Sequence, residues 1–172
     1  MSPYATLAKK AVEAYIKEKI IIDPSLDLPK SFFQKKAGVF VTIEKNKDLR
    51  GCIGTYLPTR KNIAEEIIYN AIAAATEDYR FGPIQKEELE DLSYTVYILD
   101  KPELVTDIKK LDPKKYGIIV KTIDNLKTGL LLPDLEGVDT IEKQILIACQ
   151  KAGINPFQEK IIIYKFTAKK FF

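Results

Sequence analysis

The segment GVFVTIEKNKDLRGCIGTY, residues 38–56, is the part of this 172-residue sequence that indicates the fold most directly. Two β-rich runs, Gly38–Lys45 and Leu49–Tyr56, flank the turn residues Asn46–Asp48 and together predict a β-hairpin. A hairpin pairs its strands antiparallel. The segment therefore favours an α+β fold over a doubly wound parallel sheet.

Elements on both sides of this hairpin follow from apolar periodicity and from capping residues. The sequence predicts helices over residues 2–19, 62–78 and 140–152, strands over 92–99 and 160–166, and a second hairpin over 117–123 and 128–132. After the leading helix, this order gives two β-β-α-β-like repeats with antiparallel or mixed sheets. Because no linker interrupts the chain, we expect one domain over residues 1–172, with two lobes that share a core.

The pairing of side chains in the first hairpin depends on the length of its loop. A three-residue loop places Val41 and Ile53 together on an apolar face, whereas a two-residue loop would set Ile43 against Arg50 and mix the two faces. We therefore expect the three-residue loop. The predicted polar-face pairs are Glu44 with Arg50, Thr42 with Cys52, and Phe40 with Gly54.

Composition excludes several classes of site. The chain has no histidine, which removes histidine-based triads and imidazole zinc sites. Cys52 and Cys149 are its only cysteines, too few for a disulfide framework or a zinc knuckle, so we expect no metal, no cofactor and no disulfide. With no apolar run of about 20 residues and no signal peptide, we expect a cytoplasmic protein that does not span a membrane.

Charge and arginine usage are more informative about ligands. The net charge of +3 comes from scattered lysines, so nucleic-acid binding is the least favoured function. The three arginines, Arg50, Arg60 and Arg80, lie close together in the sequence. Arginine supplies a rigid two-pronged donor for carboxylates and phosphates, which makes Arg50 and Arg80 candidate anion ligands. Arg60 lies in a turn and is expected to be exposed.

Two glycines and a carboxylate complete the candidate site. Gly51 and Gly54 flank Cys52 inside the strand, where glycine marks close approach by a ligand or by another backbone. The alternative is that both glycines admit a packed helix, with Cys52 as a small buried side chain. Asp78 follows the apolar side of its helix and needs a cationic partner if it points inward, unless the helix frays before it.

The string LRGCIGT, Leu49–Thr55, is the signature of the AMMECR domain family, which this sequence resembles over nearly its whole length. Further matches to the family follow in the family's order: Gly38–Thr42, Ala73–Phe81, Leu130–Pro133, Lys151–Gly153 and Ile163–Phe166. Relatives often have proline where Tyr79 and Gly82 stand, which affects the local turn.

The resemblance implies a two-lobed α/β domain of duplicated repeats, with a cleft near the signature. The family's molecular activity is not established. In prokaryotes such a domain is similar to one member of a three-part set with a Memo-like protein and a radical SAM protein, which implies possible partners. This chain itself lacks the three clustered cysteines that an iron–sulfur cluster needs.

Two functions remain open at the signature. In the first, the domain binds a small anionic ligand, and Cys52 is the candidate nucleophile if the domain is an enzyme. In the second, the signature surface binds a Memo-like or radical SAM partner. A ligand or partner site is favoured over catalysis, because no complete acid–base set is visible. The candidate site residues are Thr42, Arg50, Gly51, Cys52, Gly54, Asp78 and Arg80.

Overall fold

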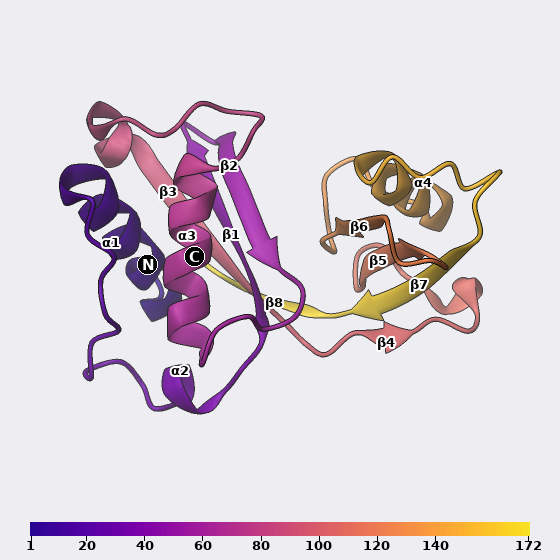
Figure 1. Cartoon of the computed structure of the whole chain (residues 1–172), viewed down its shortest axis with the longest axis horizontal. Helices are drawn as coiled ribbons and strands as arrows, with labels where there is room; N and C mark the ends of the chain where they lie inside the picture. The colour runs from indigo at the N-terminus through magenta and orange to yellow at the C-terminus, as the bar shows by residue number, and fades with distance from the viewer. The chain divides into compact units, whose positions relative to one another are not determined.

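The computed structural model describes all 172 residues, which divide into two compact units (Figure 1). Unit 1 contains Met1–Leu99 and Lys169–Phe172, and unit 2 contains Asp100–Ala168. Each unit has a hydrophobic cluster of its own. The assignment of the whole chain to a single domain stays a prediction. None of the helices is both long enough and apolar enough to cross a membrane.

Unit 1 consists of helices on one face of an antiparallel sheet. The sheet order is β2-β1-β3-β8, and α1 and α3 pack side by side over the face that carries Val39, Val41 and Ile43 (Figure 1). The elements are α1 (Pro3–Glu18), α2 (Ser31–Gln34), β1 (Gly38–Lys45), β2 (Asp48–Thr55), α3 (Ile63–Thr76), the short 3-10 helix η1 (Lys86–Asp91), β3 (Leu92–Leu99) and β8 (Ala168–Phe171).

The two long helices of unit 1 begin where the sequence predicts. The Ser2 side chain accepts a hydrogen bond from the Ala5 amide at the start of α1, and Asn62 accepts one from the Glu65 amide at the start of α3. Each cap satisfies a backbone donor that the helix itself cannot pair. α3 ends at Thr76, two residues before the predicted end at residue 78.

Unit 2 has a second sheet, of order β4-β7-β5-β6, and one long helix. Its elements are β4 (Glu103–Leu104), the 3-10 helix η2 (Ile108–Lys110), β5 (Gly117–Thr122), β6 (Thr128–Leu131), α4 (Ile141–Lys151) and β7 (Ile161–Phe166). The core of this unit lies between α4 and the sheet and includes Ile118, Val120 and Ala148. Thr140 caps α4 by accepting a hydrogen bond from the Lys143 amide.

The predicted β-β-α-β repeats are both present, so the α+β fold class is confirmed. β1-β2-α3-β3 corresponds to β5-β6-α4-β7, and in each repeat the first strand pairs antiparallel with both other strands. The chain after β3 forms β4 in the sheet of unit 2, and the chain after β7 forms β8 in the sheet of unit 1. Each sheet therefore obtains its fourth strand from the chain that leaves the other repeat.

The loop of the first hairpin differs from the prediction. It has two residues, Asn46 and Lys47, both with positive φ (54° and 73°), as in a type I′ turn. Glu44 consequently pairs with Leu49, and the predicted pair of Glu44 with Arg50 is wrong.

A β-bulge corrects the register beyond that loop. The register shifts between Ile43 and Glu44, and Arg50 is the additional residue in β2. From Gly51 onward the pairing agrees with the prediction, with Thr42 opposite Cys52. The remaining pairs are Val41 with Ile53 and Phe40 with Gly54. The one-residue bulge therefore compensates for a loop that is one residue shorter than predicted.

Candidate functional site

Gly51 and Gly54 are both explained by packing within unit 1. A Cβ on Gly51 would overlap the carbonyl oxygen of Ala74 in α3, so the strand approaches the helix backbone too closely for any side chain. A Cβ on Gly54 would overlap the ring of Phe40, its cross-strand partner. These contacts support the packing alternative, and a ligand role for either glycine stays a prediction.

Asp78 lies just beyond α3, and its side chain is only 4% exposed. The carboxylate accepts hydrogen bonds from the Cys52 amide (2.9 Å) and from the Arg80 amide (3.2 Å). Nε and Nη2 of Arg80 donate to its two oxygens at 2.9 and 2.7 Å. The helix thus ends before Asp78 and the carboxylate is nevertheless buried, because Arg80 compensates its charge.

The Asp78–Arg80 pair is ionised at neutral pH. The hydrogen bond from the Arg80 side chain, with smaller contributions from the backbone amides, lowers the pKa of Asp78 to about 2 against the opposing effect of burial. The same hydrogen bond raises the pKa of Arg80. The negative charge of Asp78 therefore holds the Cys52 backbone in place.

Arg50 forms a second arginine–carboxylate pair, with a partner that the sequence did not indicate. Its Nε and Nη2 donate to the two oxygens of Glu88 at 2.9 and 2.8 Å, and Nη1 donates to the Gly82 carbonyl at 2.9 Å. The side-chain hydrogen bond from Arg50 lowers the pKa of Glu88 to about 2. All three side-chain nitrogens of Arg50 donate hydrogen bonds, so Arg50 connects β2 to the segment before β3 that contains Gly82 and Glu88.

Glu88 could have been found from a capping pattern. Its carboxylate accepts from the Gln85 amide (2.9 Å), while the Gln85 side chain caps η1 in return. Lys45 also lies 3.2 Å from Glu88. The pattern Q-x-x-E at residues 85–88 predicts such a cap, but it gives no sign of the arginine that the same carboxylate binds.

Arg80 differs from Arg50 in having one guanidinium nitrogen that does not donate to the protein. Its side chain is 42% exposed, and its Nη1 has no partner in the protein. The guanidinium also lies 5.4 Å from the ring of Phe81. Of the two predicted arginines, Arg80 alone combines a fixed orientation with N–H groups that remain available.

Cys52 is the accessible thiol of the chain. It is half-buried, and its Sγ lies 3.2 Å from the Thr42 hydroxyl. Cys149, in contrast, is fully buried in α4, and burial raises its pKa. The Cys52 amide donates to Asp78 because Thr42 and Cys52 form a pair that exchanges no ladder hydrogen bonds, which directs this amide outward.

Glu66 is a buried charged residue that the sequence analysis did not name as a candidate. It is 1% exposed and accepts hydrogen bonds from the hydroxyls of Thr55 (2.6 Å) and Thr59 (2.8 Å) and from the amides of Thr59 and Arg60 (both 2.8 Å). Four donors compensate its burial and fix the segment after the signature. Its place beside Ile67, on the apolar side of the predicted helix, was the signal available in the sequence.

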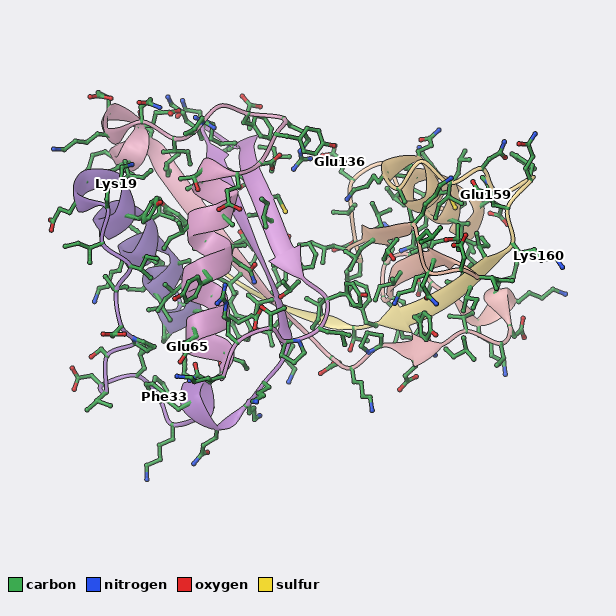
Figure 2. The ribbon with its side chains drawn as sticks, viewed as in Figure 1. Lys19, Phe33, Glu65, Glu136, Glu159 and Lys160 are labelled. Carbon is green, nitrogen blue, oxygen red and sulfur yellow. The ribbon has the colours of Figure 1, made fainter.

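Apart from the two glycines, the predicted site residues thus fall into two groups within unit 1. Thr42, Cys52, Asp78 and Arg80 form a connected cluster, which we name the thiol–arginine cluster. Arg50 lies outside that cluster, in the pair with Glu88. Figure 2 shows the side chains of the whole ribbon. Nowhere do three cysteine, aspartate or glutamate side chains converge in a way that could hold a metal ion.

Comparisons with known proteins agree on one family. The AMMECR1 family model matches residues 5–171. A protein of Thermotoga maritima is 49% identical over 170 residues, covering 98% of this chain and 97% of that one. A protein of Clostridium acetobutylicum is 46% identical over 93% of this chain, which spans only 34% of that protein.

A solved structure is similar over nearly the whole chain. The crystal structure of an uncharacterised protein from Pyrococcus horikoshii has a TM-score of 0.89 and 34% identity, and covers 97% of this chain and 88% of its own. Its similarity supports the α+β fold described above. With a family model that spans almost every residue, the chain belongs to the AMMECR1 family.

Proposed function

We propose that this protein is a binding domain whose small anionic ligand lies against Arg80 and Cys52. The observation that carries the proposal is the state of Arg80. Asp78 holds Nε and Nη2 and leaves Nη1 directed elsewhere on a side chain that is 42% exposed. A guanidinium fixed on one side and open on the other can bind a carboxylate or phosphate without first losing its conformational freedom.

Cys52 supplies the second feature of this site. Its thiol lies beside the Thr42 hydroxyl, and its electrostatic interaction with Arg80 contributes to the raised pKa of that arginine. An anion beside Arg80 would therefore contact a polarisable sulfur as well as a charged donor. Binding is the function best supported, since the only carboxylate of the thiol–arginine cluster, Asp78, is held by Arg80 and the Cys52 amide and has a lowered pKa, which makes it a poor general base.

A partner function is favoured by a different residue. Tyr79 lies between Asp78 and Arg80, and its side chain is 95% exposed. Exposed tyrosine beside arginine is typical of protein-binding surfaces. The family's prokaryotic association leads us to propose a Memo-like or radical SAM protein as the partner, with all three in the cytoplasm. In the Clostridium relative the matching region is about a third of the chain, so such a domain can occur within a longer protein.

The two arginines provide the test of ligand binding. We expect inorganic phosphate or succinate, added to the labelled protein, to shift the amide NMR signals of Cys52 and Arg80. Arg80→Lys keeps a charge for Asp78 but loses the planar donor and its two parallel hydrogen bonds to Asp78. It should therefore lower the melting temperature and also weaken anion binding about tenfold or more.

The matched control is Arg50→Lys. It should lower the melting temperature, because the two parallel hydrogen bonds to Glu88 are lost, and leave anion binding intact. Binding that disappears in Arg50→Lys and survives in Arg80→Lys would move the ligand to the other arginine.

A Tyr79→Ser variant that still co-purifies with its partner would remove Tyr79 from the docking surface.

A further inference from the structure

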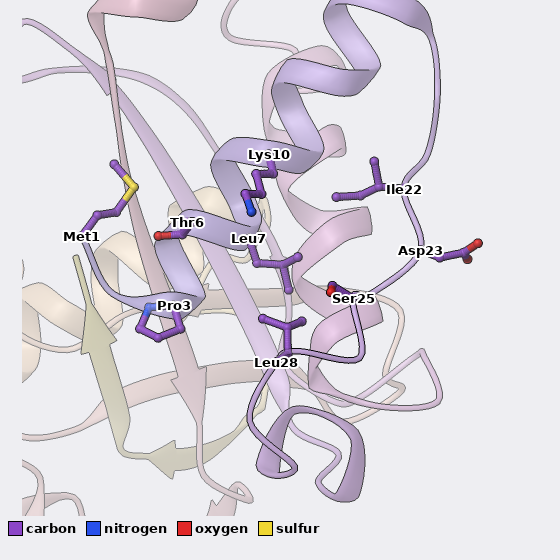
Figure 3. A pocket seen from close by; sticks show the side chains of 9 residues that line it. All are labelled: Met1, Pro3, Thr6, Leu7, Lys10, Ile22, Asp23, Ser25 and Leu28. Atoms are coloured by element: carbon purple, nitrogen blue, oxygen red, sulfur yellow. The ribbon is translucent and has the colours of Figure 1, made fainter.

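A cavity of about 340 Å³ lies in unit 1 and is lined by none of the residues of the thiol–arginine cluster. Figure 3 shows its lining side chains. One wall is a single face of α1, formed by Pro3, Thr6, Leu7 and Lys10 at helical spacing. The other wall is the segment that follows the helix. The residues lining the cavity from that segment are Ile22, Asp23, Ser25 and Leu28, and Met1 closes one end.

The second wall is an apolar segment that lacks regular secondary structure. Lys19 ends α1 with a left-handed conformation (φ 60°), and the chain turns back along the helix. This segment leaves Leu26 92% exposed, with Ile20 and Ile21 also exposed at 50% and 46%. Exposed aliphatic side chains on the same segment as an apolar cavity are typical of a binding site for an apolar ligand.

One unpaired charge faces this cavity. Lys9 pairs with Glu13 at 3.7 Å, whereas Lys10, one residue along the helix, has no anionic partner. Figure 3 shows the Lys10 nitrogen on the side of Leu7, and the Asp23 carboxylate directed away from the other lining side chains. Of the two charged side chains in the lining, Lys10 and Asp23, Lys10 is therefore the one that lies beside the aliphatic residues.

We propose that this cavity binds an aliphatic monocarboxylic acid of medium chain length. The ammonium of Lys10 holds the carboxylate, while Leu7, Ile22 and Leu28 enclose the chain. A single lysine matches a monoanion better than a phosphate dianion. At about 30 Å³ for each non-hydrogen atom, the volume of a water molecule in the liquid, the cavity holds about eleven such atoms, which is the size of octanoate or nonanoate.

The test is an NMR titration of the labelled full chain with sodium octanoate, and with octanol as an uncharged probe. Octanoate should shift the signals of residues 3–10 and 20–28. Lys10→Met should weaken octanoate binding about tenfold, the effect of one charge-assisted hydrogen bond, and leave octanol binding unchanged. Lys9→Met is the matched control, because it removes a neighbouring lysine that does not line the cavity.

A filling variant provides the second line of evidence. Leu28→Trp, at a half-buried position, should exclude both octanoate and octanol while the thermal melt stays cooperative. Equal octanoate binding by wild type and Lys10→Met would overturn the assignment of the carboxylate. Shifts confined to Cys52 and Arg80 would overturn the cavity site and support the thiol–arginine cluster instead.

Discussion

In each of the two units, a strand glycine lies against the backbone of the helix that covers the sheet. In unit 1, Gly51 of β2 lies against the carbonyl of Ala74 in α3, and in unit 2, Gly129 of β6 lies against the carbonyl of Ala148 in α4. In both, the glycine belongs to the outer strand of the hairpin and is paired with a buried aliphatic residue of the inner strand. A close approach of helix to strand is thus a property of the repeat.

In each unit, a buried side-chain amide of the helix donates to a backbone carbonyl at the start of the inner strand. Asn70 of α3 donates to the Val39 carbonyl at 3.1 Å, and Gln144 of α4 donates to the Tyr116 carbonyl at 2.7 Å. Each amide precedes the contacting alanine by one helical turn. The chain therefore uses the amide to satisfy a buried carbonyl at the start of the inner strand in both repeats.

The difference between the units lies in the charged residues. Counting from the paired glycines and alanines, Leu130 takes the place of Cys52, Ala152 that of Asp78 and Ile154 that of Arg80. Unit 2 folds with aliphatic residues at these positions. The thiol–arginine cluster is therefore not required by the repeat, and its presence in unit 1 alone supports a role in binding.

The largest expected effect comes from the paired glycines. Gly51→Ala and Gly129→Ala each place a methyl group against helix backbone and should lower the free energy of unfolding by about 3 kcal/mol. Urea denaturation measures this loss. Gly82→Ala is the control, because nothing lies within 4 Å of its added Cβ. A near-neutral result at one of the two paired glycines would end the equivalence of the repeats.

Asp78→Ala should have the next largest effect, about 2 kcal/mol, because it leaves the Cys52 amide and Arg80 without their acceptor. The effect depends on pH. The pKa of Asp78 in the folded protein, about 2, lies below the ordinary aspartate pKa of 3.8, so the contribution is complete above about pH 4 and is lost as the pH falls toward 2.

Unfolding free energies of wild type and Asp78→Ala, measured from pH 6 to pH 2, should therefore converge at the acid end. Glu88 loses its own stabilisation in a similar range, so the difference between the two proteins, and not the wild-type curve alone, reports Asp78. Parallel curves down to pH 2 would contradict the ionised pair.

The buried amides should give a smaller and unequal pair of effects. Asn70→Leu removes the bonds to Val39 and to Thr55 and should cost about 1.5 kcal/mol. Gln144→Met should cost about 1 kcal/mol, because it also removes Oε1, a buried oxygen without a partner. Thermal melts compare the two variants, and a larger loss at Gln144 would reverse this ranking.

The smallest perturbation is chemical labelling of the two cysteines in the native protein. Cys52 is half-buried on the sheet, whereas Cys149 is fully buried with a raised pKa, so iodoacetamide should modify Cys52 at least about tenfold faster. Mass spectrometry of the peptides gives both rates. Equal, slow labelling would support the alternative in which Cys52 is only a buried small side chain.

Part of the candidate site could be predicted from the sequence, because it depends on the alternation of side chains between the two faces of a strand. The pairing of Thr42 with Cys52 follows from which face of the hairpin is apolar, and it survives an error in the loop length because a bulge at Arg50 restores the register. The burial of Asp78 was likewise indicated by its place after the apolar side of α3. Its partner was left open between Arg80 and Arg50.

By itself, the sequence determined the order of the three long helices and of six strands, the two repeats and the apolar face of the first hairpin. It gave no sign of the short elements α2, β4 and β8. The features that it determined depend on periodicities of two and 3.6 residues, which are local. Only the tertiary structure decided that Arg50 binds Glu88, 38 residues away, and that Glu66 collects four donors from the segment beside it. A charged side chain is compatible with many distant partners, and the choice among them is made when packing brings one within hydrogen-bond distance.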